Sequence, residues 1–340
     1  MGNGLGSASI PSGQMQLWGY VPDFDAEAAF ASAQGNCAIL TGVTQVRYHP
    51  NREGEVCSYP GAPQVPTWTR AERLPVVPLI ANQIAGQWDR DLVAHLLSDS
   101  IRRRHHLGCI VACVAAQQHP GVELDYEFLA PRLRDDFSLF VEELAAALHD
   151  CGKTLAVAVH AKRSEAGEES GSAAQDWHRI GIAADRIAVM TYDFNPAHPG
   201  PIAPLAWTRD VLGFAISCMP ATKILQGIPL YGYRWAAGGA PAYLTHQEFI
   251  DLAHRYGTPP RRDAIDRHLV LATGTGTPAA STRERSAPEE APTIEAWLPD
   301  IETVAALGEV GRQARIAGYA VWRLGGEEPA VLSALRGKPT

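Results

Sequence analysis

Three acidic residues stand at alternate positions of a short segment, residues 121–128, that otherwise has the composition of a strand. They are Glu123, Asp125 and Glu127. Because successive side chains of a strand point to opposite faces, the three carboxyl groups would share one face. Like charges and burial both oppose ionisation, so a cluster of this kind favours retention of a proton. The spacing indicates acid–base chemistry, although an isolated pattern like this one also fits a strand with a solvated acidic face.

The composition is that of an ordinary globular chain. Of 340 residues, 46% are hydrophobic and 19% are charged, which suits an α/β barrel with insertions. The net charge of −8 gives no overall attraction to nucleic acid or to an anionic membrane. One basic run, residues 102–106, is predicted to be a solvated helix face. No apolar run reaches the roughly 18 residues that span a bilayer, so we expect no nucleic-acid or membrane partner.

Neither a metal site nor a disulfide framework is indicated. The six cysteines lack the paired spacing of a zinc or redox site, and no cofactor is expected. Residues 1–9 have neither the basic nor the apolar part of a secretory signal, so the sequence leaves localisation open. We expect residues 1–15 to form a flexible N-terminal segment, and the chain to be a monomer.

Short apolar segments alternate with amphipathic ones along the chain. Strands are expected at residues 17–21, 44–49, 74–80, 121–127, 154–159, 186–192, 224–228 and 318–322, with helices near 26–32, 91–117 and 132–150. Near-continuous apolar strands separated by helices indicate a parallel sheet that is covered on both faces. Eight such units predict a (β/α)8 TIM barrel. A doubly wound open sheet is the structural alternative.

One stretch between the seventh and eighth strands interrupts the alternation. Residues 236–293 are predicted to form a small α+β insertion on the barrel rim, with a mobile Pro/Ser/Glu-rich loop. The barrel domain would then comprise residues 16–235 and 294–340. A long disordered loop is the alternative interpretation of the insertion.

Polar and aromatic residues cluster near the carboxyl ends of the expected strands, where the loops of a barrel form the active site. Each of them alone is more often structural. Together they predict a cleft that binds carbohydrate, because aromatic rings stack on the apolar faces of sugars while acids and amides bind hydroxyl groups. These positions are Tyr20, Asn82, Glu127, His160, Tyr192, Asp193, Tyr231 and Trp322.

Four segments resemble the signatures of glycoside hydrolase family 18 on strands four, six, seven and eight. They read Gly-Val-Glu-Leu-Asp-Tyr-Glu from residue 121, Ala-Val-Met-Thr-Tyr-Asp-Phe from 188, Gly-Ile-Pro-Leu-Tyr-Gly-Tyr from 227, and Val-Trp-Arg-Leu-Gly-Gly-Glu from 321. The last two, with Ile-Glu-Ala-Trp-Leu-Pro-Asp from 294, are most similar to the spore-cortex and germination branch. The resemblance covers residues 16 to 329 and implies a chitinase-like enzyme or peptidoglycan hydrolase that acts in the cell envelope or outside the cell. Its partner would be a GlcNAc-containing polysaccharide or oligosaccharide.

The family pattern on strand four is D-x-x-D-x-D-x-E, and the chain departs from it at Pro120 and Glu123. The resemblance implies a retaining mechanism in which the substrate's own 2-acetamido group attacks the anomeric carbon. Glu127 would be the acid and then the base. Two acids on one strand face stand roughly 6.5–7 Å apart at Cα, which places Asp125 poorly as a nucleophile. The departures leave the rate and the pH optimum open.

The resemblance also implies roles for the other expected site residues. Tyr192 would donate a hydrogen bond to the acetamide oxygen, Asp193 would hold the sugar, and Asp125 would orient the acetamide N–H. Trp322 would form the floor of the site, and the remaining expected sugar contacts are Tyr20, Asn82, Met190 and Tyr231.

Two alternative functions stay open from the sequence. The first is a family-18-like glycan-binding protein without turnover, which Pro120 and Glu123 favour, although such lectins typically lack the glutamate found here at 127. The second is a barrel hydrolase that acts on a sugar without an acetamide group through another acid pair.

Overall fold

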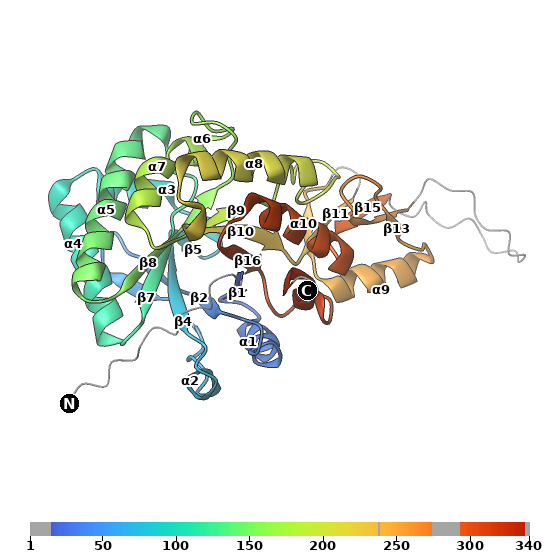
Figure 1. The fold of residues 1–340 in the computed structure, drawn as a ribbon, viewed down its shortest axis with the longest axis horizontal. Coiled ribbons are helices and arrows are strands. Elements are labelled where there is room, and N and C mark those ends of the chain that lie inside the picture. Colours follow the sequence, from blue (N-terminus) through green and yellow to red (C-terminus); the bar gives the residue numbers. More distant parts are fainter. Residues whose placement is uncertain (1–14, 237–238, 274–292, 337–340) are drawn as a thin grey trace, which may run out of the picture.

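Eight parallel strands close into a barrel in the computed structural model, which describes residues 15–236, 239–273 and 293–336 (Figure 1). Pairing of the last strand with the first completes the ring, and the TIM-barrel prediction is confirmed. A short strand, β3 (Val56–Ser58), adds to β2 in antiparallel orientation. In order around the barrel the parallel strands are β1 (Gln16–Val21), β2 (Gly42–Pro50), β4 (Val76–Ala81), β7 (Gly121–Asp125), β8 (Thr154–His160), β9 (Arg186–Met190), β10 (Ile224–Pro229) and β16 (Gly318–Trp322).

Helices surround the strands. They are α1 (Ala26–Gly35), α2 (Trp68–Ala71), α3 (Arg90–Leu97), α4 (Ser100–Ala116), α5 (Arg134–Asp150), α6 (Ser170–Ala173), α7 (Trp177–Ala183), α8 (Leu205–Cys218) and α10 (Ile301–Ala314). Short 3-10 turns occur at Pro131–Leu133, Ala221–Lys223 and Val331–Arg336. None of the helices in the described part of the chain is long and apolar enough to cross a membrane.

The single helix expected over residues 91–117 is two helices, α3 and α4. The break occurs because Asp99 caps the second one, and its carboxylate accepts hydrogen bonds from the backbone N–H groups of Ile101 and Arg102. An aspartate at this position satisfies donors that the first turn of a helix leaves free. The capping signal is local and was present in the sequence, but the apolar periodicity runs across it.

The prediction that residues 102–106 form a solvated face is wrong for two of them. Arg103 and His106 are buried, because α4 turns this face toward its neighbours. Arg103 pairs with Glu143 of α5 at 3.1 Å, and His106 Nε2 lies 2.6 Å from the hydroxyl oxygen of Tyr126. Burial lowers the pKa of His106 to about 4, so this side chain is neutral at physiological pH.

Alternate strand residues divide the core into an inner and an outer part. Apolar residues that face outward pack against the helices, as Val122 and Leu124 do with Phe137 and Phe140 of α5. Burial of each such side chain contributes roughly 1.5–3 kcal/mol to stability. The residues that face inward fill the barrel; they include Trp18, Tyr20, Leu79, Ala188, Leu225 and Ala320.

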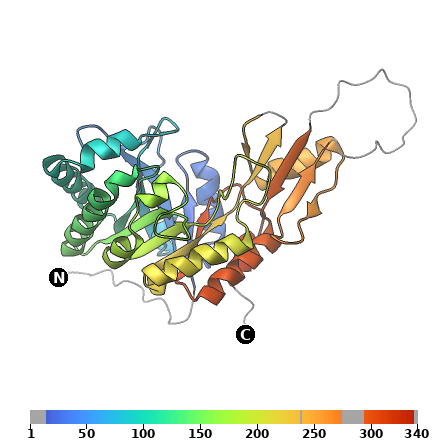
Figure 2. The ribbon, with the colours of Figure 1, turned by 90° about the horizontal axis from the view of Figure 1, so that it is seen from above.

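A second sheet stands beside the barrel, between β10 and α10 in the sequence (Figure 2). Helix α9 (His246–Tyr256) packs on it through Phe249 and Leu252. A two-stranded hairpin, β5 (Gln83–Ile84) and β6 (Gln87–Trp88), follows β4. The five strands of the second sheet, in spatial order, are β12 (Ala242–Leu244), β11 (Gly232–Ala236), β15 (Ile294–Leu298), β14 (Leu269–Ala272) and β13 (Arg261–Arg262).

The second sheet extends beyond the insertion expected at residues 236–293. Strands β11 and β15 pair with each other in antiparallel orientation, so the sheet takes in residues from Gly232 to Leu298. The division of the chain into domains otherwise stays a prediction. The predicted N-terminal segment lies almost wholly outside the described residues, and so does most of the predicted mobile loop.

Candidate active site

The three carboxyl groups of the acidic segment differ in depth. Strand β7 ends at Asp125, so Glu127 lies just beyond the strand. The chain then turns at Phe128, whose φ is 56°. The strand was expected to continue to Glu127. Glu123 is completely buried inside the barrel, whereas Asp125 and Glu127 are partly accessible. The segment thus leads from the barrel interior to its carboxyl-terminal mouth, where barrel enzymes have their active sites.

Glu123 is held by three donors inside the barrel. Its carboxylate accepts hydrogen bonds from the hydroxyl groups of Tyr20 and Thr44, the second at 3.0 Å. The guanidinium group of Arg186 lies 3.3 Å away and forms an ion pair with it. Sequence reasoning missed Thr44 and Arg186. The position of Arg186 could have indicated its role. Residues two apart on a strand share one face, and Ala188, two residues later, points into the barrel.

Asp125 and Glu127 share a hydrogen bond at the mouth of the barrel. Burial and the charge of Glu123 raise the pKa of Asp125 to about 7. Burial and the charge of Asp125 raise the pKa of Glu127 well above its ordinary value. The second oxygen of Asp125, Oδ1, is buried and has no hydrogen-bond partner. The pair therefore retains a proton near neutral pH and presents one free acceptor.

Asn82 holds the backbone of Glu127. Its Oδ1 accepts from the N–H of Glu127 at 2.8 Å, and its Nδ2 donates to the carbonyl oxygens of Glu127 at 3.1 Å and of Asp89 at 3.2 Å. The side chain is completely buried, and both amide donors are engaged. Asn82 therefore positions the backbone of Glu127, and its predicted contact with substrate stays a prediction.

Two tyrosine hydroxyl groups donate hydrogen bonds to Asp193, which follows β9 at the mouth of the barrel. The carboxylate accepts from Tyr231 at 2.5 Å and from Tyr233 at 3.0 Å. Asp193 itself is solvent-accessible, and its backbone has a φ of 55°. Although the residue as a whole is exposed, desolvation of its carboxyl group raises its pKa, and the hydrogen bonds from Tyr231 and Tyr233 partly offset this rise. Tyr231 is almost wholly buried, and its hydroxyl group holds the carboxylate of Asp193; the predicted sugar contact of Tyr231 stays a prediction.

Tyr192 lies among the carboxyl groups of the site. Burial and the charge of Asp125, followed by that of Glu127, raise the pKa of Tyr192 well above its ordinary value, so its hydroxyl group stays protonated. Its ring packs closely over the backbone of β10, where a Cβ atom on Gly227 would lie 2.8 Å from the ring. The glycine therefore allows Tyr192 to approach. The geometry provides a hydroxyl donor next to two acids.

The other expected site residues also lie at strand ends. Trp322 ends β16 and is half-buried, with its ring 5.7 Å from that of Tyr20 at an interplanar angle of 64°. Met190 ends β9 and is paired in register with His160, the last residue of β8. The imidazole of His160 lies between Glu127 and Glu169, a residue that sequence reasoning missed. Among the described residues no group of three or more His, Cys, Asp or Glu side chains could hold a metal ion.

The family model of glycosyl hydrolases family 18 matches residues 81–289, which is more than half of the chain. The chain belongs to this family. The matched range contains Asp125, Glu127 and Tyr192, and it begins at the last residue of β4. The resemblance that the four strand-end segments carried is thereby confirmed.

Two curated relatives of this family 18 chain are proteins of Bacillus subtilis (strain 168). A "putative sporulation-specific glycosylase YdhD" is 27% identical over 264 residues, which is 76% of this chain and 59% of the relative. A "cortical fragment-lytic enzyme" is 25% identical over 293 residues, 84% of this chain and 65% of the relative. The chain thus spans less than two thirds of the length of either relative.

Solved structures share the fold of this family 18 chain. The spore cortex-lytic enzyme SleL of Bacillus megaterium QM B1551 superposes with a TM-score of 0.83 at 22% identity, over 96% of this chain and 75% of that one. A chitinase from Chromobacterium violaceum ATCC 12472 superposes with a TM-score of 0.82 at 24% identity, over 94% and 98%.

Proposed function

We propose that the chain is a retaining glycosidase that cleaves β-linked N-acetylglucosaminyl bonds with assistance from the substrate. The hydrogen bond between Asp125 and Glu127 carries the proposal. Two-carboxylate glycosidases hold their carboxyl groups on either side of the bond, about 5–5.5 Å apart when retaining and about 6.5–9.5 Å apart when inverting. Two carboxyl groups that bond to each other cannot flank a sugar ring, so the nucleophile must come from the substrate.

Glu127 supplies the proton in the first step. Its carboxyl group protonates the glycosidic oxygen while the acetamide oxygen attacks the anomeric carbon, so the C–O bond to the leaving sugar breaks as an oxazolinium ring closes. Glu127 then takes a proton from the water that attacks the anomeric carbon. The ring opens, the configuration is retained, and Glu127 has its proton again.

Neighbouring groups align the acetamide. The free Oδ1 of Asp125 accepts its N–H, and this contact satisfies an oxygen that is otherwise buried without a partner. The protonated hydroxyl of Tyr192 donates to the acetamide oxygen. Trp322 provides an apolar surface beneath the sugar ring, and Asp193 binds a sugar hydroxyl group.

Peptidoglycan and chitin-type glycans are the proposed substrates, since both contain β-linked N-acetylglucosamine. The names of the relatives, a cortical fragment-lytic enzyme and a chitinase, support both kinds.

Product analysis tests the proposal. The protein is incubated with chitooligosaccharides, defined muropeptides and an acetamide-free glucan, and products are identified by mass spectrometry and their anomers by NMR. We expect β-anomeric products from acetamide-containing substrates only, and a loss of about 10²–10⁴-fold in kcat for Glu127→Gln. Cleavage of the acetamide-free glucan would exclude substrate assistance.

A glycan-binding protein without turnover remains the second candidate because Pro120 and Glu123 depart from the family pattern. The positions and raised pKa values of Asp125 and Glu127 favour the enzyme. Binding to every N-acetylglucosamine polymer without any product would identify the binding protein instead.

A further inference from the structure

We propose that His160 and Glu169 form a positioning pair for Glu127, which orients its carboxyl group and sets the pH range in which it keeps its proton. The proposal rests on the proposed acid role of Glu127. It assigns a function to the end of β8 and to the loop that follows, neither of which takes part in the steps described above.

The hydrogen bonds of His160 define which ring nitrogen carries the proton. Nδ1 lies 2.9 Å from the carboxylate of Glu169, an acceptor, so Nδ1 is the donor. Nε2 accepts the backbone N–H of Phe128 at 3.3 Å. An imidazole that donates from one nitrogen and accepts at the other is neutral, and its tautomer is fixed by its partners. The ring is almost wholly buried, which limits its other orientations.

The accepting nitrogen of His160 also faces the catalytic glutamate. Nε2 lies 3.6 Å from Oε2 of Glu127. Nε2 accepts the N–H of Phe128, and Oδ1 of Asn82 accepts the N–H of Glu127. Two consecutive peptide groups are therefore held, one by the last residue of β8 and one by the residue that follows β4. The ring thus stands directly beside the carboxyl group of Glu127 and limits the positions that this group can take.

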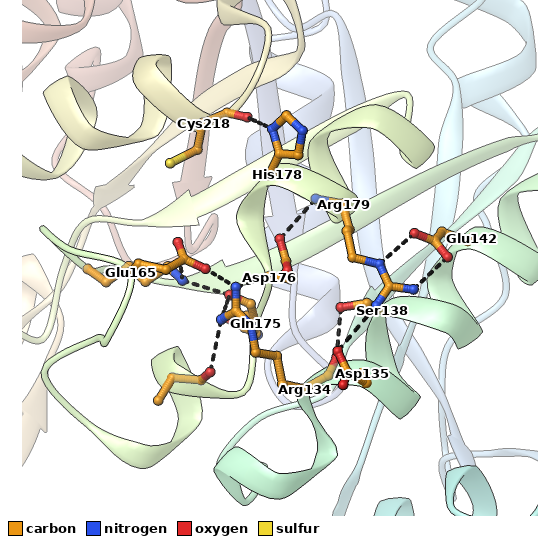
Figure 3. Close-up of polar contacts among 12 residues, drawn as sticks. Arg134, Asp135, Ser138, Glu142, Glu165, Gln175, Asp176, His178, Arg179 and Cys218 are labelled. Carbon is orange, nitrogen blue, oxygen red and sulfur yellow. Dashed lines mark hydrogen bonds and ion pairs between the residues drawn. The ribbon is translucent and has the colours of Figure 1, made fainter.

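The loop that carries Glu169 is anchored to the helices outside the barrel. Arg134 of α5 forms ion pairs with Glu165 and Asp176 and donates to the carbonyl oxygen of Ala173 (Figure 3). The side-chain oxygen of Gln175 accepts the backbone N–H of His160 at 2.8 Å. These contacts fix both ends of the loop, so Glu169 approaches His160 from a held backbone.

Glu169 remains charged where the site operates. Its pKa lies below its ordinary value, because its carboxylate accepts the hydrogen bond from His160. The charge of Glu169 also raises the pKa of Glu127, after burial and the charges of Asp125 and Asp193. The titratable groups that face Glu127 are Asp125 from β7, His160 from β8, Tyr192 and Asp193 from the segment after β9, and Glu169 from the loop before α6.

The matched pair of variants is Glu169→Gln and Glu168→Gln. Both remove one carboxylate from the same loop, but Glu168 pairs with Arg163 at 2.9 Å and does not face Glu127. We expect the alkaline limb of kcat/KM against pH to move down by about half to one pH unit in Glu169→Gln, with KM changed less than about twofold. Glu168→Gln should superimpose on the parent. An unshifted limb in Glu169→Gln, or an equal shift in both variants, would overturn the proposal.

Removal of the imidazole tests its orienting role. We expect His160→Gln to lower kcat about tenfold while KM stays within about twofold of the parent, because binding groups are untouched but the acid is less well aligned. Circular dichroism and thermal melting establish that the variant is folded. A folded variant with unchanged kcat would overturn the role of His160.

A measurement without turnover separates this proposal from the proposed function. In protein labelled with ¹³C at glutamate carboxyl groups, the Glu127 resonance is identified by its absence in Glu127→Gln. We expect its titration midpoint to fall in Glu169→Gln and to stay unchanged in Glu168→Gln. Failure to cleave any glycan would overturn the proposed function alone, whereas an unaltered midpoint in Glu169→Gln would overturn the pair alone.

Discussion

Arg186 of β9 forms an ion pair with Glu123 of β7 inside the barrel, with 3.3 Å between Nη2 and Oε2. The guanidinium group also lies over the ring of Trp18, 3.5 Å from its centroid. Glu123 is one of the two positions, with Pro120, at which the chain departs from an aspartate of the family pattern. The acid that differs is therefore the one that pairs with an arginine inside the barrel, and its charge contributes to the raised pKa of Asp125 at the mouth.

Arg186→Met should destabilise the protein by about 3–5 kcal/mol, because it leaves the buried carboxylate of Glu123 without a cation. Urea denaturation measures the loss. Adding Glu123→Gln to the same chain should recover part of it, since the uncompensated charge is then removed. As a control, Arg163→Met breaks an exposed ion pair and should cost less than about 1 kcal/mol. Equal losses in the two arginine variants would contradict the role of the buried pair.

Asp125→Asn should stabilise the protein increasingly as the pH rises. The folded-state pKa of Asp125 is raised to about 7, above its ordinary value of 3.8, so folding favours the protonated form. The parent therefore loses stability as the pH rises from about 4 through about 7, and the asparagine variant does not share this loss. We expect the difference in Tm to grow by on the order of 2 °C or more over this range. A constant difference from pH 4 to pH 8 would refute this expectation.

Asn82→Ala should impair catalysis more than binding. Loss of the amide frees the backbone of Glu127, and a small displacement of a catalytic group costs about 10–10²-fold in kcat. KM should change little, because Asn82 is buried behind the site. Asn51→Ala, which removes the amide from a surface turn, is the control and should retain parent kinetics. An increase in KM alone would instead restore Asn82 as a substrate ligand.

Tyr231→Phe should move the acid limb of kcat/KM to higher pH. Its hydroxyl donates to Asp193 and thereby lowers the pKa of that carboxyl group, so removal of the hydroxyl raises the pKa. Sugar binding by the Asp193 anion then requires a higher pH. Tyr233→Phe removes the longer hydrogen bond and should produce a smaller shift in the same direction. A downward shift in either variant would show that the protonated form of Asp193 binds the sugar.

Local patterns in the sequence were sufficient for the barrel. The apolar strand segments and the alternation in Glu123, Asp125 and Glu127 depend only on neighbouring residues, and periodicity reports these directly. The same patterns could not show that Arg103 and His106 are buried, because burial depends on which helix face meets its neighbours. They also could not show that β11 and β15 pair with each other, since these strands are far apart in the chain.

The sequence by itself determined the acids of one strand segment, Glu123, Asp125 and Glu127, and their order from the barrel interior to its mouth. Only the tertiary structure decided their partners, because each contact joins different strands or loops around the closed ring. Asn82 with Glu127, Arg186 with Glu123 and His160 with Glu169 illustrate this. The stagger of parallel strands and the path of the loops set which side chains meet, and both follow from closure of the barrel as a whole.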